Sequence, residues 1–302
     1  MSGSGNVSLD TLGLNINAAQ PQSPSNSQRR ATIGPSAVSG AVTGLHYDSN
    51  GQNITVIGGH FSATASNGST INNLLILNNT ANQEVTGLAG AIDSSSTILS
   101  MDTQGSSLYA GGTVTGNVNG NAIDGLLVYD LSAGTLNSTQ PPALSGPSVT
   151  VNAVAAQPSA TSVFVGGDFS SAGSLPCQSL CMWDTEKAQW NVPGSNFGGV
   201  VSSLTWSSNT QLVIAGNLTL GGNATTMATY DSKTQTFSPF NGASTLPGPV
   251  TALAAADSDY SQFWAAGLGT NGAGVFLEKY DGTKWTAATG LGSSSVIRGL
   301  RF

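Results

Sequence analysis

Two cysteines are the most reactive side chains of the sequence. Cys177 and Cys181 are separated by three residues and are the only cysteines of the chain. A structural zinc site takes about four ligands, and the only histidines, His46 and His60, lie in a distant part of the sequence. The C-x-x-x-C spacing also differs from the C-x-x-C of thiol oxidoreductases. We therefore predict a local disulfide, formed in an oxidising compartment, with two free thiols in the core as the alternative.

Carboxylates are the second group that could carry chemistry. Glycoside hydrolysis uses two carboxyl groups that face one another across the substrate, and the chain has only three glutamates, Glu84, Glu186 and Glu278. Four aspartates instead recur directly after an aromatic residue, at Asp130, Asp184, Asp231 and Asp281. A residue that recurs at equivalent positions serves every repeat, so we predict that these aspartates begin turns by accepting hydrogen bonds from the backbone.

Neither histidine belongs to a catalytic motif. The sequence has no G-x-S-x-G nucleophile elbow, and two histidines allow few catalytic triads. His60 directly follows a glycine doublet, which favours a polar loop role. The segment Asp257-Ser258-Asp259 offers about three oxygen ligands, whereas Ca²⁺ takes about six or more. We predict no catalytic residue and no metal site.

Residues 267–272 spell G-x-G-x-x-G, the fingerprint of dinucleotide-binding loops. That fingerprint functions only when a helix follows it and directs its N-terminus at the pyrophosphate. Here the next residues are Val275-Phe276-Leu277, which favour a strand. We predict a tight hairpin loop and no nucleotide cofactor.

The charge of the chain is low and acidic. Eight basic and fifteen acidic residues give a net charge of −7 and a pI near 4.4, and charged residues are only 8% of the sequence. Nucleic-acid binding needs clustered Lys and Arg, and the single doublet, Arg29-Arg30, lies in a Pro-, Ser- and Gln-rich stretch. The sequence has no apolar run of the length that crosses a membrane and no apolar core of a signal peptide. We therefore predict no nucleic-acid partner and no membrane insertion by this chain.

Seven N-x-[ST] sequons predict a glycosylated surface. A chain rich in Asn, Ser and Thr forms some sequons by chance, but seven of them, together with so few lysines, favour an extracytoplasmic protein. We take the chain to be a piece of a longer secreted or membrane-anchored protein. The acceptor asparagines are Asn6, Asn53, Asn67, Asn78, Asn137, Asn217 and Asn223.

The elements that position these residues form a repeat. Short β-branched and aromatic runs end in a glycine doublet or a close variant, and the first residues of the five doublets are 53, 55, 49 and 51 residues apart. A fixed period of about fifty residues indicates a repeat architecture. The doublets are Gly58-Gly59, Gly111-Gly112, Gly166-Gly167, Ala215-Gly216 and Ala266-Gly267.

Each doublet predicts a unit of four short strands. A short alternating strand precedes the doublet strand, a third strand ends in the aromatic-Asp pair, and one more apolar residue follows a turn. The first repeat has Leu77-Asn78 where the other repeats have the aromatic-Asp pair. The glycines are expected to supply backbone freedom that a Cβ would forbid.

Four strands in about fifty residues form one blade of a β-propeller and match the kelch type in length. We predict an all-β chain of kelch-like four-stranded blades in an incomplete fragment. Residues 1–40 are a linker or the remnant of a preceding blade, residues 41–295 form five blades, and residues 296–302 begin a further, truncated blade.

The repeat unit resembles a known family. The segment Val165–Gly173, followed by the two cysteines, is similar to repeats in the ectodomain of the fungal cortical marker for cell polarity, a bud-site-selection landmark. Gly58–Ser62 and Val296–Leu300 resemble the same repeats. The resemblance extends over residues 41–302.

The resemblance implies a membrane protein with a long glycosylated extracellular part, one membrane-spanning helix and a short cytoplasmic tail. Such proteins mark growth sites at the bud neck or hyphal tip together with a multispanning membrane partner, and the resemblance implies no enzymatic activity. We therefore expect a scaffold on the extracellular face of the plasma membrane that contacts protein or cell-wall polysaccharide. The alternative is a secreted carbohydrate-active or carbohydrate-binding propeller.

Overall fold

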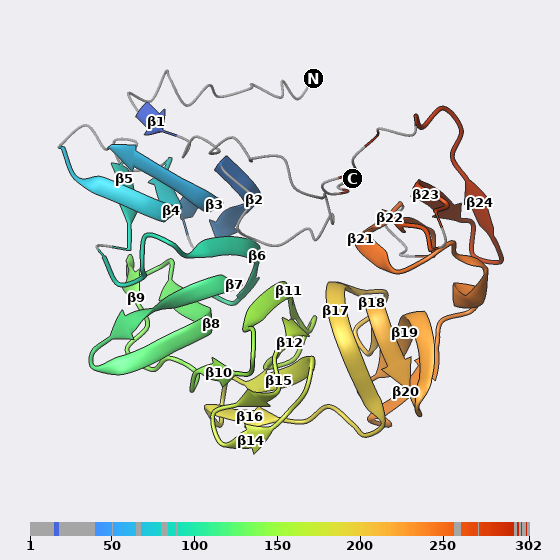
Figure 1. Cartoon of the computed structure of the whole chain (residues 1–302). Coiled ribbons are helices and arrows are strands. Elements are labelled where there is room, and N and C mark those ends of the chain that lie inside the picture. Colours follow the sequence, from blue (N-terminus) through green and yellow to red (C-terminus); the bar gives the residue numbers. More distant parts are fainter. Residues whose placement is uncertain are drawn as a thin grey trace. The chain divides into compact units, whose positions relative to one another are not determined.

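The structure of the chain is a computed structural model dominated by antiparallel strands (Figure 1). It describes residues 40–49, 51–64, 68–79, 84–88, 90–256, 261–270 and 272–292, the single residues 295, 297 and 300, and the backbone of 15–17. Most of the predicted linker over 1–40, most of the predicted strand over 296–302 and the segment Asp257-Ser258-Asp259 lie outside the described residues. In the described part, no helix has the length and apolarity needed to cross a membrane.

Five sheets follow one another along the chain, and each is built on four strands in antiparallel pairing. We call these sheets blades 1 to 5. Blade 1 contains β2 (Gly40–Ser49), β3 (Gln52–Thr64), β4 (Thr70–Asn78) and β5 (Glu84–Gly87), and β1 (Asn15–Asn17) pairs with β3. Blade 2 contains β6 (Thr97–Gln104), β7 (Ser107–Val118), β8 (Asn121–Asp130) and β9 (Thr135–Leu136).

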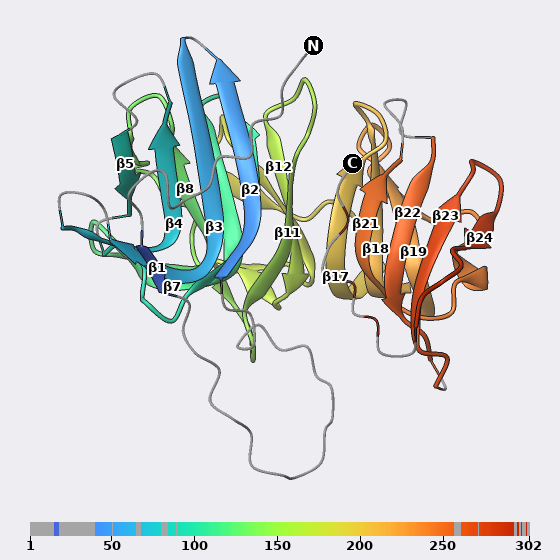
Figure 2. The same ribbon diagram turned by 90° about the horizontal axis from the view of Figure 1, so that it is seen from above.

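The other three blades repeat the same order, which Figure 2 shows for β21 to β24 of blade 5. Blade 3 contains β11 (Thr150–Ala156), β12 (Ser162–Asp168), β15 (Leu180–Asp184) and β16 (Gln189–Asn191). Blade 4 contains β17 (Phe197–Trp206), β18 (Gln211–Leu220), β19 (Asn223–Asp231) and β20 (Thr236–Pro239). Blade 5 contains β21 (Val250–Ala255), β22 (Phe263–Leu268), β23 (Val275–Tyr280) and β24 (Trp285–Ala287).

Besides β1, two features of the described residues lie outside the four-stranded pattern. A small sheet joins β10 (Leu144–Ser145), β13 (Ser171–Ala172) and β14 (Leu175–Pro176) beside blade 3. A single 3₁₀ turn, η3 (Ala243–Thr245), connects blade 4 to blade 5. Sequence periodicity predicted neither feature, because two-residue strands are too short to show alternation.

The chain forms two compact units. The first contains residues 1–101 and 106–140 and therefore blade 1 and most of blade 2, and the second contains residues 102–105 and 141–302. The core of the first unit is apolar, with Val56, Leu74, Ile98 and Leu127 fully buried. In the second unit, separate clusters form around Phe164 and Ile214 and around Phe240 and Phe263.

The glycine doublets are required for close packing, which corrects the expectation of special backbone freedom. None of their glycines has a positive φ. A Cβ on the second glycine would instead collide with a main-chain carbonyl oxygen of the neighbouring strand, at Gly40, Thr97, Thr150, Val200 or Pro249 in blades 1 to 5. The first glycine of blade 3 meets a side chain, since a Cβ on Gly166 would lie 2.5 Å from Val201 Cγ1 in blade 4. In blade 3 the doublet therefore lies close to the neighbouring strand of its own blade and to a side chain of blade 4.

Candidate functional site

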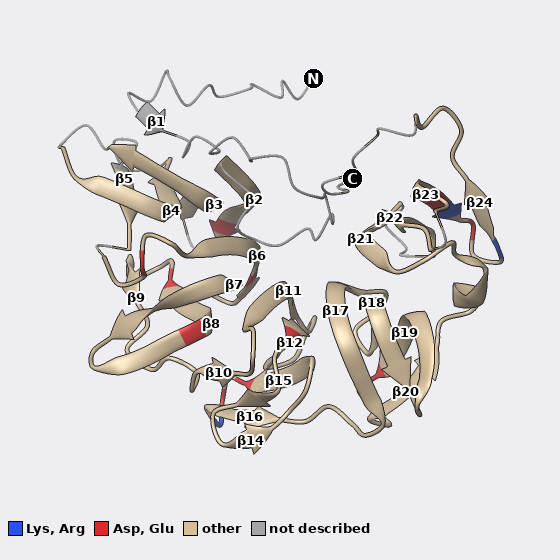
Figure 3. Cartoon of the chain, viewed as in Figure 1, with Lys and Arg blue, Asp and Glu red and all other residues tan. Residues whose placement is uncertain are grey.

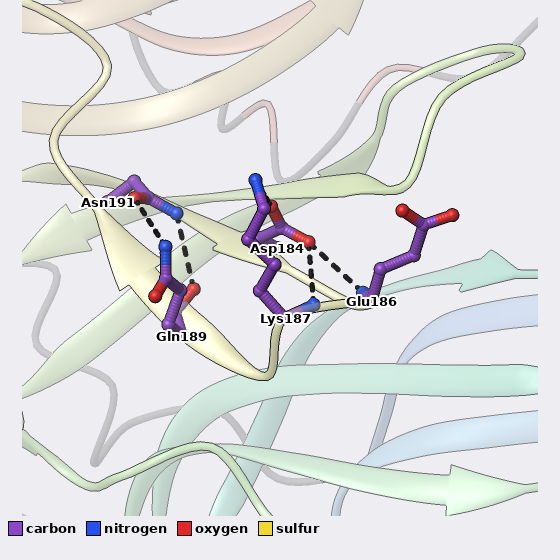
Figure 4. Close-up of polar contacts among 5 residues, drawn as sticks. All are labelled: Asp184, Glu186, Lys187, Gln189 and Asn191. Carbon is purple, nitrogen blue, oxygen red and sulfur yellow. Dashed lines mark hydrogen bonds and ion pairs between the residues drawn. The ribbon is translucent and has the colours of Figure 1, made fainter.

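The four recurring aspartates begin the hairpin between the third and fourth strands of blades 2 to 5. In blade 3, Asp184 Oδ1 accepts hydrogen bonds from the backbone N–H groups of Glu186 and Lys187 at 3.1 and 3.0 Å (Figure 4). Asp130, Asp231 and Asp281 accept the same pair of bonds in their own blades. The prediction of a turn-forming role is confirmed, because each carboxylate takes the two donors that open its turn.

These hydrogen bonds lower the pKa of the aspartates. The side-chain and backbone donors of Thr283 and the backbone N–H of Lys284 lower the pKa of Asp281 to about 2. Bonds from Lys187 lower the pKa of Asp184, and bonds from Thr234 and Lys233 lower that of Asp231. The carboxylates are therefore ionised structural acceptors. The ion pair of Lys187 with Asp184, at 3.1 Å, adds little because the lysine side chain is 68% exposed.

Among the described residues, three other carboxyl groups have a raised pKa. Desolvation raises the pKa of Asp102, although its oxygens accept bonds from the backbone N–H groups of Ala156 and Thr103, each at 2.8 Å. Desolvation also raises the pKa of Asp124 on β8 and of Glu278 on β23. Glu278 is 9% exposed as a whole residue. Asp102 and Asp124 belong to blade 2, and Glu278 belongs to blade 5.

The remaining sequence candidates are dispersed. His46 is exposed on β2, and His60 Nδ1 donates to the carbonyl of Ser96 at 2.9 Å. Glu186 is exposed in the turn of blade 3, and Glu84 begins β5. Charged residues are sparse along the described sheets (Figure 3). Among the described residues, no group of three or more His, Cys, Asp or Glu side chains could hold a metal ion.

The two cysteines and the glycine-rich loop lie in local structures. Cys177 and Cys181 form a disulfide with Cα atoms 5.8 Å apart, and it closes the loop that leads into β15. The G-x-G-x-x-G segment joins the antiparallel strands β22 and β23, where the Gly269 N–H donates to the Gly274 carbonyl at 2.7 Å. A strand follows this loop, as the sequence predicted, so no helix N-terminus faces it.

The sequon asparagines differ in their surroundings. Asn6 and Asn67 lie outside the described residues. Asn53 accepts a hydrogen bond from Asn79, Asn137 accepts one from the backbone N–H of Thr139, and Asn78 ends β4, where its side chain is half-buried. Asn217 on β18 and Asn223 on β19 are both exposed.

A pocket of about 890 Å³ opens on blade 4 beside these two asparagines. Its walls come from the β18–β19 hairpin, from β20, and from the connection to blade 5 that contains η3. Asn217, Asn223, Thr225, Phe237 and Phe240 are among its lining residues, and no lining residue is charged. Sequence reasoning identified the two asparagines as sequons but had no signal for the cavity, since its walls lie up to about seventy residues apart along the chain.

A second recurring position also went unpredicted. In blades 1, 3 and 4, the residue five positions before the last residue of the aromatic-Asp or Leu-Asn pair bonds to the next blade or to the segment that leads into it. These residues are Asn73, Ser179 and Thr226. Asn73 Nδ2 donates to the carbonyls of Asp93 and Ser94, ahead of β6. Ser179 donates to the Gly199 carbonyl, and Thr226 to the Ala243 carbonyl at 3.0 Å. We call these three the linking residues; their changing identity concealed them in the sequence.

Comparison with known proteins assigns this arrangement to a family. Residues 126–302 match the model of the Rax2 C-terminal beta propeller domain. The chain is 40% identical over 302 residues to polarized growth protein L1 of a Phoma species, an alignment that covers 98% of this chain and 23% of that protein. It is 33% identical over 187 residues to polarized growth protein RAX2 of Candida albicans, covering 57% of this chain and 13% of that protein.

The two relatives are thus several times longer than this chain, and both carry polarized growth in their names. The matched family confirms the predicted β-propeller class of the five blades. It also supports a connection with cell polarity.

Proposed function

The chain belongs to the family of Rax2 C-terminal β-propeller domains, and from this premise we propose that it is the extracellular propeller of a membrane-anchored fungal landmark for polarized growth. The observation that carries the proposal is the 40% identity to a polarized growth protein along nearly the whole chain. In this proposal the blades form a glycosylated scaffold that contacts a membrane-protein partner or cell-wall polysaccharide, and the chain catalyses no reaction.

The surface chemistry supports a scaffold. Four carboxylates are engaged in turns of their own blades, and few charged groups remain. A neutral surface of hydroxyls and amides suits contact with polysaccharide or with another neutral protein surface, because it binds through hydrogen bonds and exerts no strong long-range field. The sequons on exposed strands fit an extracellular site.

The competing proposal is a carbohydrate-active enzyme. A hydrolase would use two carboxyl groups about 5–10 Å apart, one of them with a raised pKa. Glu278 has the raised pKa of such an acid. The experiment must therefore remove Glu278 as a functional group while it separately disturbs the blade frame.

Localisation of the tagged full-length protein in fungal cells tests the proposal. Gly166→Val with Trp183→Ala should abolish its accumulation at bud necks or hyphal tips, because the first change overlaps Val201 and the second empties a buried site. His46→Ala, His60→Asn and Glu278→Gln should each leave localisation and the choice of growth sites unchanged. Loss of growth-site choice in the Glu278→Gln protein, when it is folded and correctly localised, would favour the enzyme instead.

A further inference from the structure

We propose that the pocket on blade 4 is occupied by the N-linked glycan of Asn223, which packs back onto its own blade. The inference rests on the proposed extracellular function, since N-glycans are added in the secretory pathway. It names one glycan and one receptor surface within the chain.

The first observation is the state of the acceptor amides. Asn217 and Asn223 are exposed, and within the described part of the chain neither side chain makes a hydrogen bond. Asn53 and Asn137, in contrast, use their side-chain oxygens in local hydrogen bonds. Asn217 and Asn223 are thus exposed sequon asparagines without side-chain hydrogen bonds, and both line the pocket.

The second observation is the polarity of the lining. Thr225, Thr226 and Thr270 donate their hydroxyl protons to backbone carbonyls, at 2.9, 3.0 and 3.2 Å. Their oxygens therefore face a ligand mainly as hydrogen-bond acceptors. Sugar hydroxyls are donors, so these oxygens complement a carbohydrate. The absence of charged residues from the lining suits a neutral sugar.

The third observation is the size and apolar part of the pocket. Its volume of about 890 Å³ lies within the range of about 300–1,000 Å³ of small-molecule sites, which accommodates the first two sugars of an N-glycan. Phe237, Phe240 and Pro247 supply apolar surface. The C–H groups of a sugar ring pack favourably on such surface, because the apolar face of the ring is removed from water.

The position of Asn223 selects it over Asn217 and over a free polysaccharide. Residues 223–226 line the pocket without interruption, so a glycan on Asn223 begins on the wall itself. A covalently attached ligand has an effective concentration of the order of mM, which a separate neutral polysaccharide must exceed to compete. The attached glycan is therefore the resident ligand.

The glycan would join two segments that are otherwise held by few bonds. One wall is the β18–β19 hairpin, and the opposite wall is the connection at 243–249, where the Thr245 and Leu246 N–H groups close single turns. A ligand that bridges both walls suppresses local opening of the connection. Hydrogen exchange at 243–249 therefore reports on occupancy of the pocket.

The test uses the full-length protein purified from fungal membranes, as wild type and with Asn223→Gln, Asn217→Gln or Asn137→Gln. Glycopeptide mass spectrometry should find a glycan on Asn223. Amide exchange at 243–249 should become about tenfold faster in Asn223→Gln and stay unchanged in Asn137→Gln, which removes a sequon outside the pocket. Trimming the folded wild type with an endoglycosidase that leaves the first sugar should give a smaller increase without any mutation.

The outcomes separate this inference from the proposed function. A protein glycosylated at Asn137 but bare at Asn223 would overturn the inference and leave the extracellular assignment standing. A glycan on Asn223 whose removal leaves exchange at 243–249 unchanged would also overturn it, as would an effect confined to Asn217→Gln. A protein without glycan at any sequon would contradict the extracellular function itself.

Discussion

Blades 3 and 4 share one frame but differ in the segment between their second and third strands. In blade 3, β12 ends at Asp168, and the chain passes through the small β13–β14 hairpin and the Cys177–Cys181 disulfide before β15. In blade 4, β18 continues to Leu220 and returns at once as β19, beside an open pocket with two sequons. The segment of blade 3 is closed by a disulfide, whereas the strands that flank the turn in blade 4 expose two sequon asparagines.

The comparison shows which residues the fold requires and which are available for function. Both blades keep the buried aromatic, the turn aspartate, the glycine at the close approach and a linking hydroxyl, at Ser179 and Thr226. Of these features, only Ser179 lies in the variable segment, as its last residue before β15. Insertions between the second and third strands therefore change the surface without changing the frame, as is usual for loops on a rigid scaffold.

Truncation of the shared aromatic should have the largest effect and should be similar in the two blades. Trp183→Ala and Tyr230→Ala should each lower the free energy of unfolding by about 3–5 kcal/mol, because the side chains are 4% and 2% exposed and pack against other rings. Urea denaturation measures this loss. Tyr230→Phe is the matched control; it keeps the ring, loses only the bond to the Pro193 carbonyl, and should cost about 1–3 kcal/mol. A large loss in only one blade would show that the frame is not shared.

A methyl group at the close approach should have the next largest effect, again in both blades. Gly167→Ala and Gly216→Ala place a Cβ against the carbonyl oxygens of Thr150 and Val200, so each should cost about 1–3 kcal/mol. The control is Gly44→Ala, where the nearest atom would be 3.7 Å away and the stability should change by less than about 0.5 kcal/mol. Equal midpoints of thermal unfolding for all three variants would refute the close-approach role.

The frame was largely readable from the sequence because its residues recur. The spacing of the doublets and of the aromatic-Asp pairs predicted the strands and the turns, since hydrophobic alternation and turn chemistry are local properties. The reason for the glycines was wrong, because a close approach of two strands depends on the register between segments and leaves no local trace.

The candidate site was readable only in part. The sequons mark Asn217 and Asn223 in the sequence, but the pocket is formed by segments that meet only after folding. The linking residues were not predicted from the sequence, because Asn, Ser and Thr can all donate the same kind of hydrogen bond. A search for repeats of identical residues does not detect a position where the residue type changes from blade to blade.

Reduction of the disulfide should lower the stability of blade 3 alone, and by less than the aromatic truncations. The loop it closes is short, so its loss should cost about 2 kcal/mol by the loop-length relation. Scanning calorimetry with and without a reducing agent measures the effect, and a Cys177→Ala/Cys181→Ala protein should not respond to the reducing agent. Labelling of both cysteines by a thiol reagent in the unreduced, folded protein would contradict the prediction.

The turn aspartates should give the smallest effect, visible only in acid and alike in the two blades. The pKa of Asp184 and of Asp231 is lowered by backbone hydrogen bonds, so the unfolded chain binds protons more readily than the folded one. Their stabilisation is complete above about pH 5 and is lost as the pH falls through the lowered pKa. Asp184→Asn and Asp231→Asn keep the acceptor oxygen, so each should reduce the loss of stability on acidification.

The response of Glu278 to acid should be opposite in direction to that of the two turn aspartates. Desolvation raises its pKa, so the folded state binds the proton more readily, and the folded protein gains stability as the pH falls through that raised pKa. Glu278→Gln removes this gain and should steepen the acid loss, opposite to the two Asp→Asn changes. Thermal midpoints of the wild type and the three variants, measured from pH 7 to pH 2, give the comparison. Parallel curves for Glu278→Gln and Asp231→Asn would contradict the assignment of burial to one carboxyl and of turn hydrogen bonds to the other.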